Sequence, residues 1–300
     1  MQLSLSATLP HAQADGLVAV LFSPAHAPAV PALLATLGDM PPPAGDTGQA
    51  GQQRLRALGG QTVLLLGVGE TPEAETLRRA VHTAVSKANE ARFTQLSLTW
   101  ALPTAPDLSV LGEAVLLSNY QFLRYFREPK PRSLQAVTLI SDASDGEGAL
   151  QEGVACARAA CVARDLVNEP ANTLTAEALA KRAEELGQEF GFGVEVLNQS
   201  RIKALKMGGL LAVNAGSQAP PTFSILSYEP EGHSDEPPVV LVGKGVVFDT
   251  GGLSLKPTAN SMDFMKSDMG GAAAVIGALC GVAALKLPRR VIGLIPATDN

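Results

Sequence analysis

The sequence predicts an α/β protein in which a smaller N-terminal α/β domain precedes a second α/β domain, whose mixed sheet is flanked by helices. Its 300 residues are enough for two domains. Hydrophobic residues make up 46% and charged residues 17%, with a mean hydropathy of +0.15, which is typical of a well-buried soluble chain. Short apolar runs alternate with amphipathic helical patterns, as expected for a sheet with helices on its faces.

The N-terminal domain is expected to cover residues 1–145. Thr71 is a plausible N-cap for a helix, because Pro72 would occupy the first helical position. Apolar residues at three- or four-residue steps predict that this helix is amphipathic: Leu77, Val81, Val85 and Ala88. The other expected elements are strands at 16–22, 62–66 and 136–140, a loop at about 40–52 and a helix at 110–126.

The second domain is expected to cover residues 146–300, after an acidic, glycine-containing stretch at Ser141–Gly148. A long helix should end near residue 167, because Pro170 forbids simple continuation. Thr175 should cap a helix that runs to about Phe190. The remaining pattern predicts strands at 193–197, 222–228, 239–248 and 290–295, and an alanine-rich helix at 271–286.

Charge and hydropathy argue against several classes of partner. The net charge is −6 and the pI about 5.3, so no global attraction to nucleic acid is expected. No apolar run reaches the roughly 18–20 residues of a membrane-spanning helix, and the N-terminus lacks the basic region of a secretory signal. Three cysteines without metal-type spacing fit reduced thiols. We therefore expect a cytoplasmic protein without a membrane partner.

The most informative stretch runs from Val239 to Lys256. Its first ten residues predict a fully buried strand, interrupted only by Lys244, and Asp249 follows directly. An unpaired buried charge costs roughly several kcal/mol, so each of these two groups needs a partner. They could form an ion pair with each other, or both could face a metal ion, since desolvation lowers the pKa of a lysine and makes its neutral amine available.

Neighbouring residues favour a ligand site at this strand end. Gly251 and Gly252 allow close backbone approach where α/β sheets bind ligands. Asp268 precedes a predicted helix, and could be an N-cap, which contributes about 1 kcal/mol, or a further metal ligand. Carboxylates with an amine suit Zn²⁺, Mn²⁺ or Mg²⁺. Lys256 is either a surface lysine before Pro257 or an electrophile that stabilises a developing oxyanion.

The run Val-Gly-Lys-Gly-Val-Val-Phe-Asp-Thr-Gly-Gly-Leu-Ser-Leu-Lys-Pro, followed by Met-Asp-Phe-Met-Lys-Ser-Asp-Met-Gly-Gly-Ala, resembles the active-site signature of the leucyl aminopeptidase family (cytosol aminopeptidase, peptidase family M17). The resemblance is close from about residue 150 to 300 and looser before it. Four further segments resemble the same family: 119–125, 164–172, 207–213 and 291–298.

The resemblance implies a two-metal aminopeptidase that releases N-terminal amino acids from peptides, with a leucine-type preference. It implies that Lys244, Asp249 and Asp268 are ligands of two divalent ions, Mn²⁺ or Zn²⁺, with Asp249 touching both. It implies that Lys256 is the catalytic lysine and that Met265 lines the pocket for the first side chain of the substrate. Peptide substrates and further copies of the chain, in a hexamer, are the implied partners.

One departure from the family concerns a later Asn-Thr-Asp-Ala-Glu-Gly-Arg segment. In the family this segment supplies an aspartate and a glutamate to the metals, and an arginine that holds a bicarbonate base. This sequence contains no such segment, so it carries three of the five expected ligating side chains. We expect the catalytic domain at 146–300 to be truncated at its C-terminus, the chain to be a fragment of a longer protein, and the 300 residues alone to be inactive.

Two other functions remain as alternatives. The same fold could serve as a non-catalytic oligomeric scaffold or as a DNA-binding regulator, although the net charge argues against nucleic acid. A nucleotide-binding module is suggested by Gly67-Val-Gly69 and by Gly243-Lys244-Gly245. Both fail the stricter patterns, since the first has no third glycine and Pro238 stands where a phosphate-binding loop needs glycine.

Overall fold

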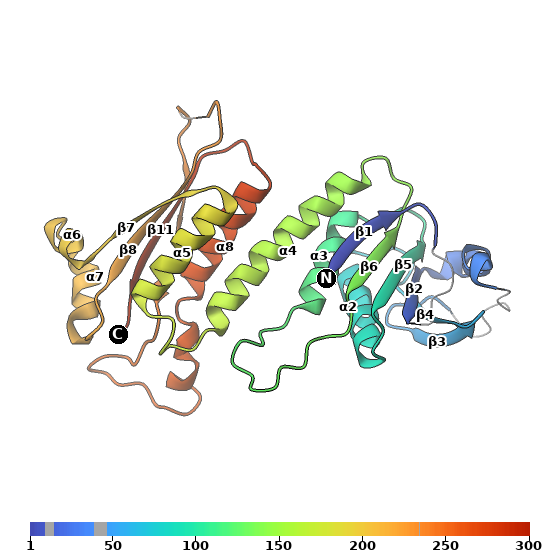
Figure 1. Cartoon of the computed structure of the whole chain (residues 1–300), viewed down its shortest axis with the longest axis horizontal. Coiled ribbons are helices and arrows are strands. Elements are labelled where there is room, and N and C mark those ends of the chain that lie inside the picture. The colour runs from blue at the N-terminus through green and yellow to red at the C-terminus, as the bar shows by residue number, and fades with distance from the viewer. Residues whose placement is uncertain (10–14, 39–46, 234) are drawn as a thin grey trace. The chain divides into compact units, whose positions relative to one another are not determined.

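The computed structural model describes residues 1–9, 15–38, 47–233 and 235–300 of the chain. It has an α/β architecture in two compact units, Met1–Ala157 and Arg158–Asn300 (Figure 1). The predicted α/β class and the mixed sheet of the second unit are confirmed. Helix α4, Gly146–Asn168, runs through the division between the units, and the domain boundary at 145–146 stays a prediction.

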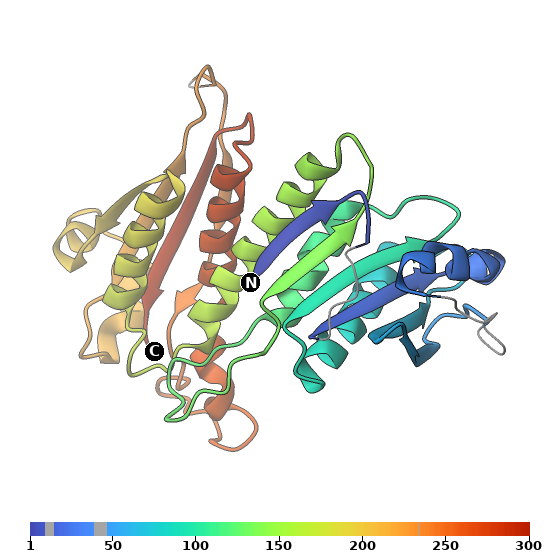
Figure 2. The same ribbon diagram turned by 45° about the vertical axis from the view of Figure 1, so that its right-hand side comes forward.

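The first unit is built on a six-stranded sheet in the order β1-β6-β5-β2-β4-β3 (Figures 1 and 2). Neighbouring strands are parallel except β3 and β4, which are antiparallel. The central strand β2 is buried along its whole length, because side chains pack on both of its faces. The strands are β1 (Gln2–Ser6), β2 (Gly16–Phe22), β3 (Gln53–Leu58), β4 (Gln61–Gly67), β5 (Gln95–Ala101) and β6 (Ala136–Ile140).

Helices cover both faces of this sheet. On one face lie α2 (Ala74–Glu90), α3 (Leu108–Asn119) and the first part of α4, which share a large apolar core with the strands. On the other face the short helices η1 (Pro24–Ala29), α1 (Val30–Leu33) and η2 (Ala35–Leu37) close a smaller core.

Some predictions for the first unit are confirmed and others are wrong. The three predicted strands are present, and α2 buries the predicted residues Leu77, Val81, Val85 and Ala88. The predicted cap is wrong, because the N-cap is Glu73 and not Thr71. Helix α3 ends at Asn119 instead of 126, since Tyr120 adopts an extended backbone. Of the predicted loop, residues 40–46 lie outside the described residues, and strands β1, β3 and β5 were not predicted.

The second unit contains a mixed five-stranded sheet. Strands β9 and β10 both pair in parallel with β11, which is antiparallel to β8, and β8 is antiparallel to β7. On β8 and β11, alternate side chains are buried. The strands are β7 (Gly193–Leu197), β8 (Thr222–Tyr228), β9 (Val239–Val242), β10 (Gly245–Val246) and β11 (Val291–Thr298).

Helices α5 (Ala176–Phe190) and α8 (Gly270–Ala284) pack on this sheet together with the last part of α4, and form one apolar core with it (Figure 2). As predicted, Thr175 caps α5, because its side chain accepts a hydrogen bond from Ala178 N at 3.2 Å. The remaining short helices are α6 (Gln199–Ala204), α7 (Gly208–Val213), η3 (Asn214–Gly216) and η4 (Met262–Ser267).

The strand predicted at 239–248 differs from expectation in two ways. It is interrupted at Gly243 and Lys244, so that β9 and β10 are separate. It is also not fully buried, since Val239, Val240 and Val242 are 47, 50 and 70% exposed. The reason is that β9 and β10 pair only with β11 among the described strands, and therefore form an edge of the sheet.

One helical stretch, Met262–Ala284, is long and apolar enough to cross a membrane by length and composition, contrary to the expectation from the sequence. More than half of its most apolar window is buried in the protein. Ala272, Ile276 and Leu279 of this stretch lie fully buried in the core of the second unit. Its apolar character is therefore accounted for by packing against the sheet.

Candidate active site

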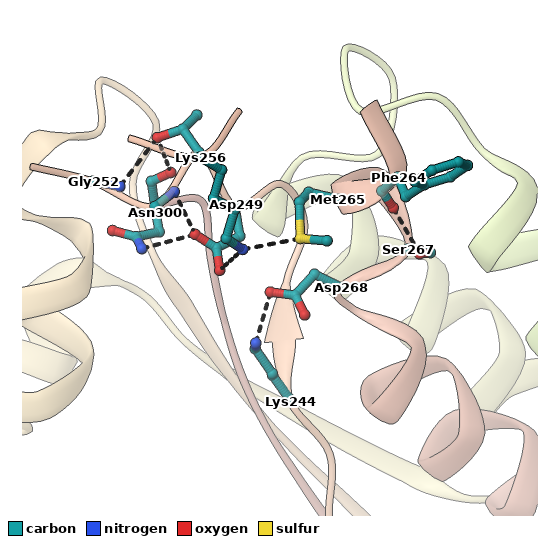
Figure 3. A network of polar contacts seen from close by, with 11 residues as sticks. Lys244, Asp249, Gly252, Lys256, Phe264, Met265, Ser267, Asp268 and Asn300 are labelled. Atoms are coloured by element: carbon teal, nitrogen blue, oxygen red, sulfur yellow. Dashed lines mark hydrogen bonds and ion pairs between the residues drawn. The ribbon is translucent and has the colours of Figure 1, made fainter. Parts of the chain in front are cut away.

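The five residues singled out from the sequence lie together around the short strand β10 (Figure 3). Lys244 occupies the break between β9 and β10, and Asp249 follows β10 after a few residues. Lys256 lies in the loop that leads to η4. Met265 belongs to η4, and Asp268 connects η4 to α8. All five thus come from one continuous segment, residues 244–268, which leads from the β9–β10 break to the start of α8.

Two glycines bring Lys244 against the beginning of α8. A Cβ atom on Gly243 would lie 2.7 Å from Gly271 O, and one on Gly271 would lie 2.9 Å from Lys244 N. In this close contact Ala272 N donates a hydrogen bond to Lys244 O at 2.9 Å. A side chain at either glycine would separate the two backbones, so both glycines are needed to place Lys244 beside Asp268.

The charged side chains form two ion pairs. Lys244 Nζ lies 2.7 Å from Asp268 Oδ2, and Lys256 Nζ lies 2.6 Å from Asp249 Oδ2 (Figure 3). A direct Lys244–Asp249 pair, one of the two interpretations of the sequence, is therefore wrong. The expected burial of Lys244 is wrong as well, since its side chain is 55% exposed at the edge of the sheet, whereas Asp249 is only 16% exposed.

Asp249 is held by three donors. Besides Lys256, Gly251 N donates to its Oδ1 at 2.8 Å and Asn300 Nδ2 donates to the same oxygen at 2.9 Å. These contacts lower the pKa of Asp249 to about 2, with the hydrogen bond from the Lys256 ammonium as the largest cause. The carboxylate of Asp249 is therefore ionised at all ordinary pH values and available to a cation.

The loop after Asp249 depends on left-handed glycines. Gly251 has φ +91° and Gly252 has φ +64°, and a Cβ on Gly251 would overlap Ser254 O. The loop closes through a hydrogen bond of 2.8 Å from Lys256 N to Thr250 O. It directs Lys256 Nζ to within 2.9 Å of Met265 Sδ, so that the methionine and the lysine meet beside Asp249 (Figure 3).

Asp268 is not an N-cap. The N-cap of α8 is Met269, without a side-chain hydrogen bond. Asp268 Oδ2 is buried, and although Lys244 Nζ is close to it, no described group donates a hydrogen bond of acceptable geometry to this oxygen. Because a buried carboxylate needs a compensating charge, the ammonium of Lys244 at 2.7 Å is what neutralises this oxygen in the described structure.

The donor set of this cluster fits a hard divalent cation. Asp249 and Asp268 supply carboxylate oxygens and Lys244 an amine, which Zn²⁺, Mn²⁺ and Mg²⁺ accept. The described residues contain no group of three or more histidine, cysteine, aspartate or glutamate side chains that could hold a metal ion. A metal site here therefore needs Lys244 as well as the two aspartates.

Two residues that support the site were not identified from the sequence. Asn300, which follows β11, reaches Asp249 because β10 and β11 are parallel and their carboxyl ends meet at one edge. Lys266 lies in η4, and its Nζ donates to Val167 O at 2.8 Å and to Asn168 O at 3.1 Å, at the C-terminal end of α4. The position of Asn300 after a strand was the signal for the first, whereas nothing in the sequence indicated the second.

Comparison with known sequences gives a consistent family. Residues 161–300 match the sequence model of the "Cytosol aminopeptidase family, catalytic domain". A "Probable cytosol aminopeptidase" of Chlorobaculum tepidum is 42% identical over 297 residues, which cover 89% of this chain and 58% of the relative. A protein of the same name from Roseiflexus castenholzii is 37% identical, and the match covers 88% of this chain and 57% of the relative. The chain thus spans somewhat more than half the length of these relatives.

Solved structures share the fold. The "Bottromycin maturation enzyme BotP in complex with Mn" is 34% identical, with a TM-score of 0.78, over 96% of this chain and 60% of that one. A mutant of tomato leucine aminopeptidase has a TM-score of 0.86 over all of this chain and 63% of that one. At 23% identity, the second likeness concerns the fold alone.

Proposed function

We propose that the chain forms part of a two-metal aminopeptidase of the cytosol aminopeptidase family, whose catalytic-domain model its residues 161–300 match. The reaction is the release of N-terminal amino acids from peptides, with a leucine-type preference. Because the chain spans only part of its relatives, we assign to it a part of the active site, with the remaining ligands on a segment outside these 300 residues.

The observation that carries this proposal is the pairing of two aspartates with two lysines at one strand end. Asp249 and Asp268 each face an ammonium group, at 2.6 and 2.7 Å, and both aspartate side chains are largely buried. Lys244, Asp249 and Asp268 would hold the cations, which we expect to be Mn²⁺ or Zn²⁺. The similarity to BotP, whose solved structure is a complex with Mn, supports the first of these.

Two divalent ions, when bound, supply an activated water and a polarised scissile carbonyl. The residues of this chain then have separate tasks. Lys256 leaves Asp249 and places its ammonium where negative charge develops on the carbonyl oxygen of the substrate. Met265, whose sulfur lies beside that ammonium, lines the pocket for the first side chain of the peptide.

We also propose partners and a location for this protein. Peptides are the substrates, and the enzyme assembles as a homo-oligomer, a hexamer by the family resemblance. The names of the curated relatives support a cytosolic location. No described feature favours the scaffold or DNA-binding alternatives over the peptidase.

The decisive test is Lys256→Ala in the full-length protein. Removing a donor that stabilises an oxyanion typically lowers the rate by about 10²–10³-fold, so kcat for a leucine anilide should fall by that amount in the presence of Mn²⁺. Lys181→Ala, at an exposed position on α5, serves as the control and should keep full activity. Unchanged hydrolysis by Lys256→Ala would show that the lysine has no catalytic role.

A further inference from the structure

We infer that Asn300 is a positioning residue that fixes the orientation of the Asp249 carboxylate. The effect of this orientation on metal binding rests on the proposed two-metal function. Neither the family description nor the sequence pattern assigns a role to this asparagine.

The two oxygens of Asp249 have different partners. Oδ1 accepts hydrogen bonds from Gly251 N at 2.8 Å and from Asn300 Nδ2 at 2.9 Å. Oδ2 receives only the Lys256 ammonium, at 2.6 Å, among the described residues. Both donors to Oδ1 are uncharged and belong to the backbone or to a short side chain, whereas the donor to Oδ2 is the ammonium at the end of a long side chain, which a divalent cation can replace.

Asn300 is itself held in place by the backbone. Its N donates to Phe248 O at 2.9 Å, and its O accepts from Thr250 N and from Thr250 Oγ1, both at 2.8 Å. Asn300 thus bonds to the residues on both sides of Asp249. The side-chain amide lies against Gly252, where a Cβ atom would come within 3.1 Å of Asn300 Oδ1.

This arrangement leaves Oδ2 as the oxygen that faces the cation site. The terminal torsion of an aspartate is broad, so a single donor to Oδ1 would let the carboxylate rotate. With Gly251 and Asn300 both bonded to Oδ1, rotation would break two hydrogen bonds at once. Groups that orient a metal ligand in this way typically change metal affinity or activity by about 10–100-fold when they are removed.

The test uses the full-length protein with two substitutions, Asn300→Ala and Asn300→Leu, which remove the amide and, in the second case, keep its size. Mn²⁺ affinity is measured by electron paramagnetic resonance of free Mn²⁺ during titration, and hydrolysis of a leucine anilide is measured as a function of Mn²⁺ concentration. Asn198→Ala is the matched control, because this residue caps α6 far from the site in sequence, and we expect its loss to lower stability without changing metal binding.

We expect both Asn300 variants to bind Mn²⁺ about 10-fold or more weakly, with much of kcat recovered at high Mn²⁺. Asn198→Ala should melt at a lower temperature and bind Mn²⁺ normally. If Asn300→Leu is folded and binds Mn²⁺ like the wild type, the inference is wrong. If the wild type itself neither binds Mn²⁺ nor cleaves the anilide, the proposed function fails instead.

Discussion

At the scale of single residues, the site depends on which charges face each other. The sequence indicated that Lys244 and Asp249 need partners, but it could not say which. The structure pairs each of them with a residue further along the chain, Asp268 and Lys256. The ammonium groups of Lys244 and Lys256 therefore neutralise the two carboxylates.

The low pKa of Asp249 predicts how the free energy of unfolding changes at acid pH. Its pKa falls from an ordinary value of 3.8 to about 2, mainly through the hydrogen bond from Lys256. A depressed folded-state pKa contributes stability above the unfolded value, and this contribution disappears as the pH falls through the folded value. Metal-free wild-type protein should therefore lose more stability between about pH 4 and pH 2 than Asp249→Asn.

Urea unfolding at several pH values in this window measures the difference. Asp263→Asn, an exposed aspartate in η4, is the control and should follow the wild-type curve. Parallel curves for wild type and Asp249→Asn would mean that the Lys256 hydrogen bond does not stabilise the folded protein.

At the scale of elements, the close approach of the β9–β10 break to α8 is the feature on which the site depends. Gly271 lies against Lys244 N, whereas a Cβ on its neighbour Gly270 would meet nothing within 4 Å. The sequence predicted the helix but could not distinguish these adjacent glycines. Only Gly271 lies against Lys244, which precedes it by almost thirty residues in the chain.

The two glycines make a matched pair of substitutions. Gly271→Ala should destabilise the second unit by roughly 1–3 kcal/mol, as overpacking typically does. Gly270→Ala should be neutral or stabilise by up to about 1 kcal/mol, because alanine favours the helix. Thermal and urea unfolding of both variants measure the effect. Equal stabilities for the two variants would rule out the close backbone contact.

At the scale of the whole molecule, each unit has a core of its own. The only tryptophan of the chain, Trp100, lies on β5 and packs against the core of the first unit. Its fluorescence therefore reports on that unit. Leu98 on the same strand is completely buried, whereas Leu55 on the edge strand β3 is 55% exposed.

Leu98→Ala should destabilise the first unit by about 2–5 kcal/mol, because it removes buried methyl groups and leaves a cavity. The midpoint of the Trp100 fluorescence transition in urea should fall accordingly. Leu55→Ala should move it by less than about 1 kcal/mol, since an exposed side chain loses little burial. Equal shifts for the two variants would contradict the assignment of Leu98 to the core.

The sequence predicted most of the regular elements, because apolar runs and helical periodicity are local signals. It missed β1, β3 and β5. Strand β1 is short and polar, and the alternating arginines of β3 belong to a half-exposed edge strand. The five residues singled out from the sequence do lie together in the structure, yet the pairing of their charges and the contribution of Asn300 depend on strand register. Register arises from contacts between distant segments, which no local pattern contains.

The hydrogen bonds from Lys266 to the last carbonyls of α4 join stretches of chain that are 98 and 99 positions apart. The turn that carries Met265 and Asp268 is thereby anchored to the segment just before Asn168-Glu-Pro. A change in the length or direction of that helix end would therefore be transmitted to Met265 and Asp268. Amino-acid substitutions at the end of α4 and in η4 should therefore be considered together when related proteins are compared, because the two segments are bonded to each other.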